Sequence, residues 1–141
     1  MLINEKYIDK LKSLKQIENK IIIGDTLSNL KKIPSNSINS IITSPSYFLK
    51  KSYESDESFM SYMEFHNNVI VECKRILKKN GSIFWNVAQS VQDNEMIPLG
   101  AIFYKSFRDI NLYLKNWIIW KFEGGECPRS RLFGRYENVL W

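Results

Sequence analysis

Hydrophobic and polar positions follow two periods along this chain, one typical of helices and one typical of buried strands. Residues 7–17 and 59–77 carry apolar side chains three or four positions apart, which predicts two amphipathic helices. Short β-branched or aromatic runs bounded by glycine or polar residues predict buried strands. The predicted strands are residues 21–23, 38–42, 82–88, 117–122 and 137–141.

Proline, glycine and small polar residues mark the ends of the predicted elements. Thr26 can cap a short helix that ends at Pro34–Asn36. Pro98 is suited to the first turn of a further helix, and Asn80-Gly81 is typical of a helix end. A strand, a helix and a strand between residues 21 and 42 predict a right-handed parallel unit.

The alternation of strands and helices predicts an α/β fold with a mostly parallel sheet that helices cover on both faces. The length of 141 residues is typical of a single domain. We expect a helical N-terminal segment over residues 1–20 and one further unit over residues 21–141. Because the chain stops within the apolar run Val139–Trp141, we expect a truncated gene product or an expressed fragment.

Composition narrows the class of protein. Hydrophobic residues make up 44% and charged residues 25%, which excludes a disordered, collagen-like or disulfide-dense chain. The net charge of +5 favours a phosphate-bearing partner. No apolar run reaches the roughly 18 residues of a membrane helix, so we expect no membrane partner. Two cysteines without CxxC spacing favour a reducing, cytoplasmic location, and the single histidine predicts no metal site.

The most informative segment, Ile41–Tyr47, places Ser44, Pro45 and Tyr47 directly after a predicted buried strand. In open parallel sheets, ligands bind outside the carboxyl ends of strands. A hydroxyl and a carbonyl beside a rigid proline can both accept hydrogen bonds from one amino group. The tyrosine ring can stack on a planar base. This combination predicts a site for a flipped-out nucleobase that carries an exocyclic amino group.

The segment Ser44–Tyr47 resembles the catalytic motif of DNA amino-methyltransferases, in which a small polar residue is followed by two prolines and an aromatic residue. Residues 21–42 resemble the approach to that motif in the permuted order, in which the catalytic part precedes the cofactor part. The resemblance covers residues 21–141. The segments that resemble later family motifs are residues 75–81, 117–121 and 135–141.

This resemblance implies the three-layer, Rossmann-like fold of S-adenosylmethionine-dependent methyltransferases, here incomplete. It implies methyl transfer from S-adenosylmethionine to the exocyclic amino group of a base flipped out of double-stranded DNA. The implied catalytic residues are Ser44, Pro45, Ser46 and Tyr47. Serine at position 44 resembles the cytosine-N4 branch of the family, and adenine-N6 remains the alternative.

The resemblance also implies binding residues. Asp25 and Thr26 are expected to bind S-adenosylmethionine, with the Asp25 carboxylate accepting a hydrogen bond from the adenosine. Asp25 can equally cap the helix that follows it. A loop rich in arginine can follow DNA phosphates, and a solvated loop is the alternative. The arginines of this loop are Arg129, Arg131 and Arg135.

The chain also departs from the family pattern. Ser46 replaces the common second proline, and Tyr136 stands where histidine is frequent. No Phe-x-Gly-x-Gly turn occurs, and in the permuted order this turn and the target-recognition region follow residue 141. Two other functions therefore stay open: a non-catalytic subunit completed by a second polypeptide or by a homodimer, and a nucleic-acid-binding module without catalysis.

Other conspicuous side chains have structural interpretations. We expect Cys73 to be inert on an apolar helix face and His66 to lie on a helix surface. The basic residues between positions 74 and 79 are expected to form a solvated last helix turn. The tryptophans expected in the core are Trp85, Trp117 and Trp120.

Overall fold

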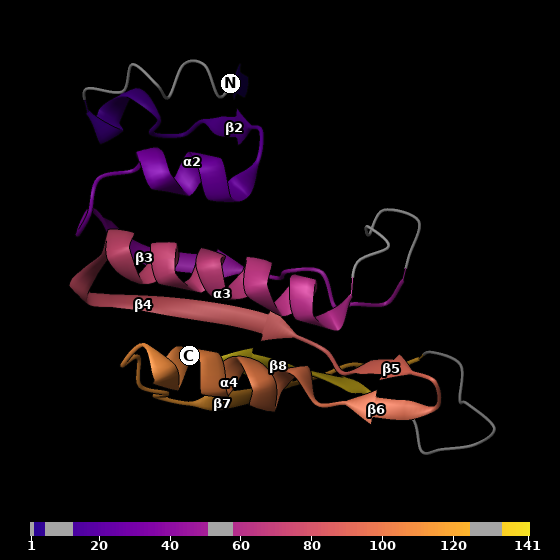
Figure 1. The fold of residues 1–141 in the computed structure, drawn as a ribbon. Helices are drawn as coiled ribbons and strands as arrows, with labels where there is room; N and C mark the ends of the chain where they lie inside the picture. Colours follow the sequence, from indigo (N-terminus) through magenta and orange to yellow (C-terminus); the bar gives the residue numbers. More distant parts are fainter. Residues whose placement is uncertain (1, 5–12, 51–57, 125–133) are drawn as a thin grey trace.

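The computed structural model describes residues 2–4, 13–50, 58–124 and 134–141 (Figure 1). Strands and helices alternate along these ranges, as the sequence predicts for an α/β fold. In chain order the elements are β1 (Leu2–Asn4), a 3₁₀ turn η1 (Leu14–Gln16), β2 (Ile21–Ile23), α2 (Thr26–Lys32), β3 (Ile38–Thr43), α3 (Phe59–Ile76), β4 (Leu77–Val87), β5 (Ser90–Gln92), β6 (Glu95–Ile97), α4 (Leu99–Asp109), β7 (Trp117–Lys121) and β8 (Tyr136–Leu140).

A four-stranded sheet has the strand order β3–β4–β8–β7. Strands β3 and β4 are parallel, with Thr43 opposite Trp85. Strand β8 is antiparallel to both β4 and β7. The sheet is therefore mixed, which corrects the prediction of a mostly parallel sheet. The physical reason is that β7 and β8 form an antiparallel pair, and β8 also lies antiparallel beside β4, so only β3 and β4 are parallel neighbours.

Strand β2 does not join this sheet. It pairs in parallel with β1, with Leu2 opposite Ile21, so the predicted parallel unit of β2, α2 and β3 does not form. Residues 2–4, which we expected in a helical segment, are thus a strand. Of the helix predicted over residues 7–17, positions 7–12 lie outside the described residues, and Leu14–Gln16 form a 3₁₀ turn capped by Ser13.

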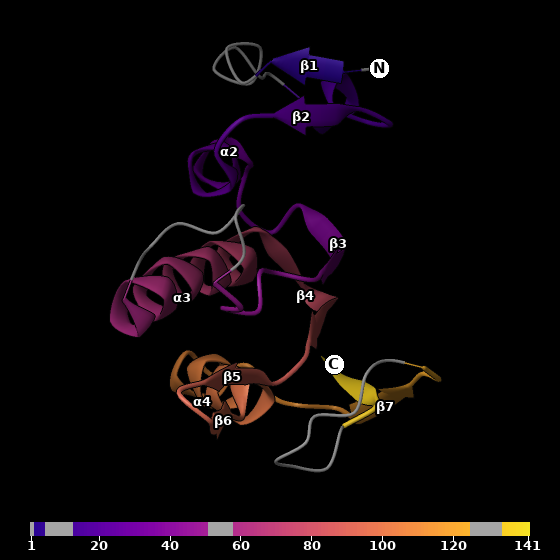
Figure 2. The ribbon, with the colours of Figure 1, turned by 90° about the vertical axis from the view of Figure 1, so that its right-hand side faces the viewer.

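Helices α3 and α4 lie on the same face of the four-stranded sheet (Figure 2). The Ser58 hydroxyl caps the start of α3 by accepting the amide of Ser61 at 3.1 Å, and α4 begins directly after Pro98. Within the described ranges no helix covers the opposite face, contrary to the expectation of helices on both faces (Figure 2). Ile41 packs against the core, so its neighbour Ile42 points to this opposite face, where it is 80% exposed. The most deeply buried apolar side chains are Tyr62, Ile70, Trp85, Val87, Leu99 and Phe103.

Two expectations about single side chains are wrong. His66 is buried because it lies one helical turn after Tyr62 on the core-facing stripe of α3, and its Nδ1 is 2.7 Å from the Tyr62 carbonyl oxygen. Trp85 is buried as predicted, but Trp117 and Trp120 are 37% and 59% exposed. They lie on β7, which is an edge strand of the sheet and is covered by fewer neighbours.

The Asn80-Gly81 pair is not a helix end. Helix α3 ends earlier, and β4 already pairs with β3 at Leu77. The register then shifts, because one residue of β3 faces four residues of β4 between the Ile38–Leu77 and Ser40–Ser82 pairs. A Cβ atom on Gly81 would come within 2.9 Å of the Asn39 carbonyl oxygen, so glycine permits the close approach of the two strands.

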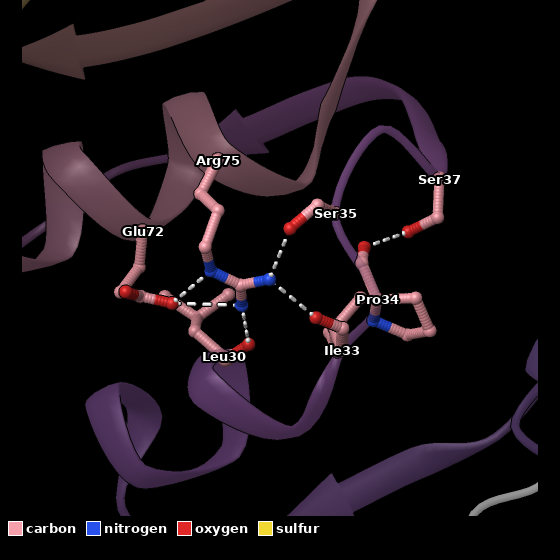
Figure 3. Close-up of polar contacts among 7 residues, drawn as sticks. All are labelled: Leu30, Ile33, Pro34, Ser35, Ser37, Glu72 and Arg75. Carbon is pink, nitrogen blue, oxygen red and sulfur yellow. Dashed lines mark hydrogen bonds and ion pairs between the residues drawn. The ribbon is translucent and has the colours of Figure 1, made fainter.

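Arg75 joins α3 to α2 and to the loop that follows α2 (Figure 3). Its guanidinium donates to the carbonyls of Leu30 and Ile33, both at 2.8 Å, and to the Ser35 hydroxyl at 3.0 Å. It also pairs with Glu72 at 2.8 Å. These partners correct the expectation of a solvated side chain, because carbonyls at the end of α2 need donors from outside the helix.

Candidate active site

The catalytic-motif segment Ser44–Tyr47 begins directly after the last residue of β3. Because β3 and β4 are parallel, their carboxyl ends lie side by side, with Thr43 opposite Trp85. The first residues of β8 reach the same edge, since β8 runs antiparallel to β4. The segment therefore lies where ligands bind in open α/β sheets, as the sequence predicts.

Three polar side chains meet around the Tyr47 hydroxyl. The Ser44 hydroxyl lies 2.6 Å from it, and Tyr47 donates to the Glu137 Oε2 atom at 3.0 Å. The Asn86 amide nitrogen lies 2.9 Å from the Tyr47 oxygen and 2.5 Å from the same Glu137 oxygen. The structure thus brings Ser44 and Tyr47 together, with Ser44 exposed and Tyr47 half-buried.

The backbone of the segment is fixed by hydrogen bonds from the core. The Tyr62 hydroxyl donates to the Ser46 carbonyl at 2.7 Å. The side chains of Ser90 and Gln92 donate to the carbonyl of Phe48, at 2.7 and 2.6 Å. Phe48 itself is buried and has a φ of 54°, which turns the chain sharply at the end of the segment.

The Pro45 carbonyl differs from the carbonyls of Ser46 and Phe48. No described residue donates to it, whereas the carbonyls of Ser46 and Phe48 both have donors. Ser44 is exposed beside it, so within the described part of the chain the Ser44 hydroxyl and the Pro45 carbonyl can each accept a further hydrogen bond at one edge of the sheet. Proline fixes the φ of this turn and so limits the movement of both groups.

The electrostatics of the site keep the phenol protonated. Burial raises the pKa of Tyr47 above its usual value of 10.0, and the neighbouring Glu137 carboxylate raises it as well. The hydrogen bonds from Ser44 and Asn86 act in the opposite direction and do not cancel these effects. At neutral pH Tyr47 is therefore uncharged and has a proton to donate.

Sequence reasoning missed Asn86 and Glu137 as members of the site. The sequence contains a signal for each of these two residues. Asn86 is a polar residue between Trp85 and Val87 at the end of a buried strand, and Glu137 is an acid inside an apolar strand. What the sequence did not indicate is that β8 lies beside β4, which brings these two side chains to Tyr47.

Asp25 and Thr26 lie apart from this segment, at the end of β2 and the start of α2. The Asp25 carboxylate caps α2 by accepting the Ser28 amide at 2.8 Å through Oδ1, so the helix-cap interpretation of Asp25 is confirmed. The prediction that Thr26 caps this helix is wrong, because Thr26 is its first helical residue. The hydrogen bonds from Ser28 lower the pKa of Asp25, which is therefore ionised at neutral pH. Both residues are exposed, so the carboxylate stays accessible to a ligand while it caps the helix.

The arginine loop is only partly described. Arg129 and Arg131 lie outside the described residues. Arg135 is exposed next to β8, and its carbonyl accepts the amide of Phe122 at 3.1 Å. Because Arg135 is exposed, it is accessible to DNA, and its contact with a phosphate stays a prediction.

Two kinds of site are absent from the described parts of the chain. Among those residues, no group of three or more histidine, cysteine, aspartate or glutamate side chains is placed to hold a metal ion. None of the described helices is both long and apolar enough to cross a lipid bilayer.

A separate hollow lies away from the catalytic-motif segment. It is lined by Leu77 and Ile83 of β4, Tyr104 and Phe107 of α4, and Trp141. Leu77 and Ile83 belong to the beginning and middle of β4, whereas the Ser44–Tyr47 segment lies at the carboxyl end of the parallel strands. We therefore do not assign this hollow to the chemistry of the segment.

Cys73 is not part of the site, and its properties give a direct prediction. Burial raises the pKa of the Cys73 thiol from 9.0 to about 11. Because the thiolate is the reactive form, a Cys127→Ser variant should react with Ellman's reagent at pH 8 about 100-fold more slowly than a free thiol. Because the folded-state pKa lies above the unfolded value, Cys73 should leave stability unchanged at neutral pH and reduce it as pH rises from about 9 towards 11. Rapid, stoichiometric labelling of the folded Cys127→Ser variant would contradict the burial of Cys73.

Comparison with known families decides the classification. A family model described as DNA methylase matches residues 38–141, a range that includes β3, the segment Ser44–Tyr47 and β8. The chain belongs to this DNA methylase family. The match agrees with the resemblance drawn from the motif and from the order of the segments around it.

Two curated relatives of this DNA methylase chain illustrate its extent. The type II methyltransferase M.BglII of Bacillus subtilis is 36% identical over 128 residues, which cover 90% of this chain and 36% of the relative. M.HpaI of Haemophilus parainfluenzae is 28% identical over 127 residues, covering 88% of this chain and 38% of the relative. The chain thus spans little more than a third of the length of these relatives.

Solved structures share the fold of this DNA methylase chain. A Thermus thermophilus protein described as a DNA modification methylase gives a TM-score of 0.70 at 24% identity, covering 84% of this chain and 50% of that one. The cytosine-N4-specific PvuII DNA methyltransferase also gives 0.70, at 18% identity, covering 85% and 47%. These likenesses confirm the predicted Rossmann-like methyltransferase fold.

Proposed function

We propose that this chain is the catalytic part of a DNA methyltransferase that transfers a methyl group from S-adenosylmethionine to the exocyclic amino group of a flipped base. The observation that carries the proposal is the pair of available acceptors, the Ser44 hydroxyl and the Pro45 carbonyl, beside the half-buried Tyr47 ring. The match to the DNA methylase family model, over residues 38–141, includes this segment and supports the proposal. The relatives M.BglII and M.HpaI are both named as type II methyltransferases.

The segment can orient an amino group for methylation. An exocyclic amino group has two hydrogens, and the Ser44 hydroxyl and the Pro45 carbonyl can accept one each. The nitrogen lone pair is then turned away from both acceptors, which is positioning and electrostatic catalysis without a covalent enzyme intermediate. The Tyr47 ring can stack on the base and hold it out of the duplex. The Ser46 carbonyl accepts a hydrogen bond from the Tyr62 hydroxyl, and this bond holds the backbone of the segment in place.

The described residues fit one half of the cofactor. The exposed Asp25 carboxylate can accept a hydrogen bond from the adenosine of S-adenosylmethionine, with Thr26 beside it. When bound, this cofactor supplies an electrophilic methyl group on a positively charged sulfur. The target nitrogen would accept this methyl group, and Asp25 and Thr26 would hold the adenosine half of the cofactor while Ser44 and Pro45 orient the nitrogen. The sequence has no Phe-x-Gly-x-Gly turn for the methionine half.

We propose cytosine-N4 as the target and adenine-N6 as the alternative. The reason is Ser44, since serine at the first motif position resembles the cytosine branch of the family. Similar proteins with names that give the target include both kinds: the PvuII enzyme is cytosine-N4-specific, and YhdJ of Escherichia coli is a DNA adenine methyltransferase. The partner we propose is double-stranded DNA, with Arg129, Arg131 and Arg135 on its phosphates.

A second candidate is a subunit that a second polypeptide or a second copy of the chain completes. The uncovered face of the four-stranded sheet favours it, because Ile42 and Trp120 are 80% and 59% exposed in the structure. Large exposed apolar groups of this kind are typical of surfaces that another chain or segment covers.

The proposed activity is tested by transfer of tritiated methyl groups from S-adenosylmethionine to DNA by the complete gene product, followed by nucleoside analysis. We expect label in N4-methylcytosine, and the Ser44→Ala variant is the negative control. Label in N6-methyladenine would support the alternative base. Label in 5-methylcytosine, or no label from a gene product that binds both DNA and cofactor, would contradict the proposed reaction.

A further inference from the structure

Glu137, at the start of β8, is placed to set the direction of the hydrogen bonds in the candidate active site. Its Oε2 atom lies 3.0 Å from the Tyr47 hydroxyl and 2.5 Å from the Asn86 amide nitrogen. The side chain is half-buried and comes from the strand that pairs with β4. It lies 90 residues from Tyr47 in the chain, so the fold alone creates this contact.

The Asn86 amide has one orientation that agrees with its surroundings. With Nδ2 towards Glu137 and Tyr47, the amide donates to both oxygens. The reverse orientation would place the amide oxygen against a carboxylate oxygen, and neither of these groups can donate. Asn86 Oδ1 is buried and has no hydrogen-bond partner among the described residues, so this orientation leaves one acceptor unsatisfied and is held by the other two contacts.

The acceptor-only character of an ionised carboxylate fixes the proton of Tyr47. The phenol must donate to Glu137, because the carboxylate has no hydrogen of its own. The Tyr47 oxygen is then left only with accepting roles, towards Asn86 and towards the Ser44 hydroxyl at 2.6 Å. Ser44 therefore donates to Tyr47, and its remaining lone pairs face outward as acceptors.

We propose that Glu137 is a positioning residue that, through Tyr47, turns the Ser44 hydroxyl into a hydrogen-bond acceptor for the exocyclic amino group of the target base. The proposal rests on the proposed function and adds a specificity element to it. An amino group donates hydrogen bonds. If the hydrogen of the Ser44 hydroxyl pointed outward, two donors would face each other and no hydrogen bond could form. A carbonyl oxygen of thymine or guanine would be disfavoured at the same position for the reverse reason.

The titration behaviour of Tyr47 is consistent with this role. Burial first and the Glu137 carboxylate next raise the pKa of the phenol. Tyr47 therefore retains, at neutral pH and above, the proton that it donates to Glu137. The dependence of the Tyr47 pKa on Glu137 can be measured without methyl transfer.

Three variants of the complete gene product test the proposal. Glu137→Leu removes the acceptor at similar size, Glu137→Gln keeps one acceptor oxygen, and Tyr47→Phe keeps the ring but removes the hydroxyl. We expect Glu137→Leu to lower kcat at least about 10-fold with little change in KM for DNA. We expect Glu137→Gln to retain most of the activity, because its amide oxygen can replace Oε2.

The double variant separates positioning from simple packing. If Glu137 acts through the Tyr47 hydroxyl, Glu137→Leu should cause no further loss of kcat in the Tyr47→Phe background. Independent, multiplicative losses would overturn the proposal, as would a Glu137→Gln variant that is as impaired as Glu137→Leu.

A spectroscopic measurement covers the case in which Glu137→Leu fails to fold. Ultraviolet difference titration against Tyr47→Phe isolates the Tyr47 phenol, and its pKa should be lower in Glu137→Gln than in the unaltered protein. An unchanged pKa would overturn the coupling. This readout also separates the two proposals: a gene product that methylates no DNA refutes the proposed function, while the titration still decides whether Glu137 controls Tyr47.

Discussion

Replacing Tyr47 with alanine should lower kcat for DNA methylation about 100-fold or more while the protein remains folded. The variant loses the ring that stacks on the extruded base and the hydroxyl that joins Ser44 to Glu137. Ser44→Ala should cause a loss of similar order, because one of the two acceptors for the amino group is removed. Single-turnover methyl transfer by the complete gene product measures both effects.

Tyr113→Ala is the matched control for the tyrosine change. Tyr113 is 67% exposed and packs under Arg108, away from the catalytic-motif segment, so its variant should methylate at the unaltered rate. Circular dichroism should show the same helix content in all three variants. Methylation at the unaltered rate by both Ser44→Ala and Tyr47→Ala would refute the roles assigned to them.

Replacing Arg75 with methionine should lower the free energy of unfolding by about 2–3 kcal/mol. The guanidinium donates to two carbonyls near the end of α2 and to Ser35, and it pairs with Glu72, which is mostly buried (Figure 3). Methionine keeps much of the side-chain volume but supplies none of these donors. Urea unfolding followed by tryptophan fluorescence measures the change.

Lys105→Met is the control for the lost positive charge. Lys105 pairs with Asp109 one turn along α4, and both side chains are largely exposed. An exposed pair of this kind contributes at most about 0.5 kcal/mol, so Lys105→Met should leave stability nearly unchanged. Equal losses in the two variants would contradict the assignment of Arg75 as the link between α2 and α3.

Local patterns in the sequence predicted most elements because their causes are local. The β-branched run at Ile21–Ile23, the capped start of α2 and the apolar stripe of α3 depend on neighbours within a few residues. The position of Ser44 and Tyr47 after β3 also followed from local order. The structure has each of these elements at the predicted position. The strand at residues 21–23 is not buried as predicted, however, because Ile21 and Ile23 are 65% and 55% exposed in β2, which pairs only with β1 among the described residues.

Pairing between distant segments was not predictable in the same way. Nothing near β8 indicates that it lies between β4 and β7, and this choice makes the sheet mixed and brings Glu137 to Tyr47. Gly81 was interpreted as a helix end, although Asn-Gly is also compatible with an irregular strand. The contact that decides between these two interpretations is the close approach of the Asn39 carbonyl, which is 42 positions away in the sequence. His66 was placed at the surface by its polarity, although its position on α3 belongs to the buried stripe.

A crystal structure of the complete gene product with cofactor analogue and target DNA tests the central claim most directly. We expect the target base outside the duplex, stacked on Tyr47, with its exocyclic nitrogen about 2.7–3.2 Å from both the Ser44 hydroxyl and the Pro45 carbonyl oxygen. A base that remains stacked in the DNA, or an amino group bound by other residues, would contradict the account.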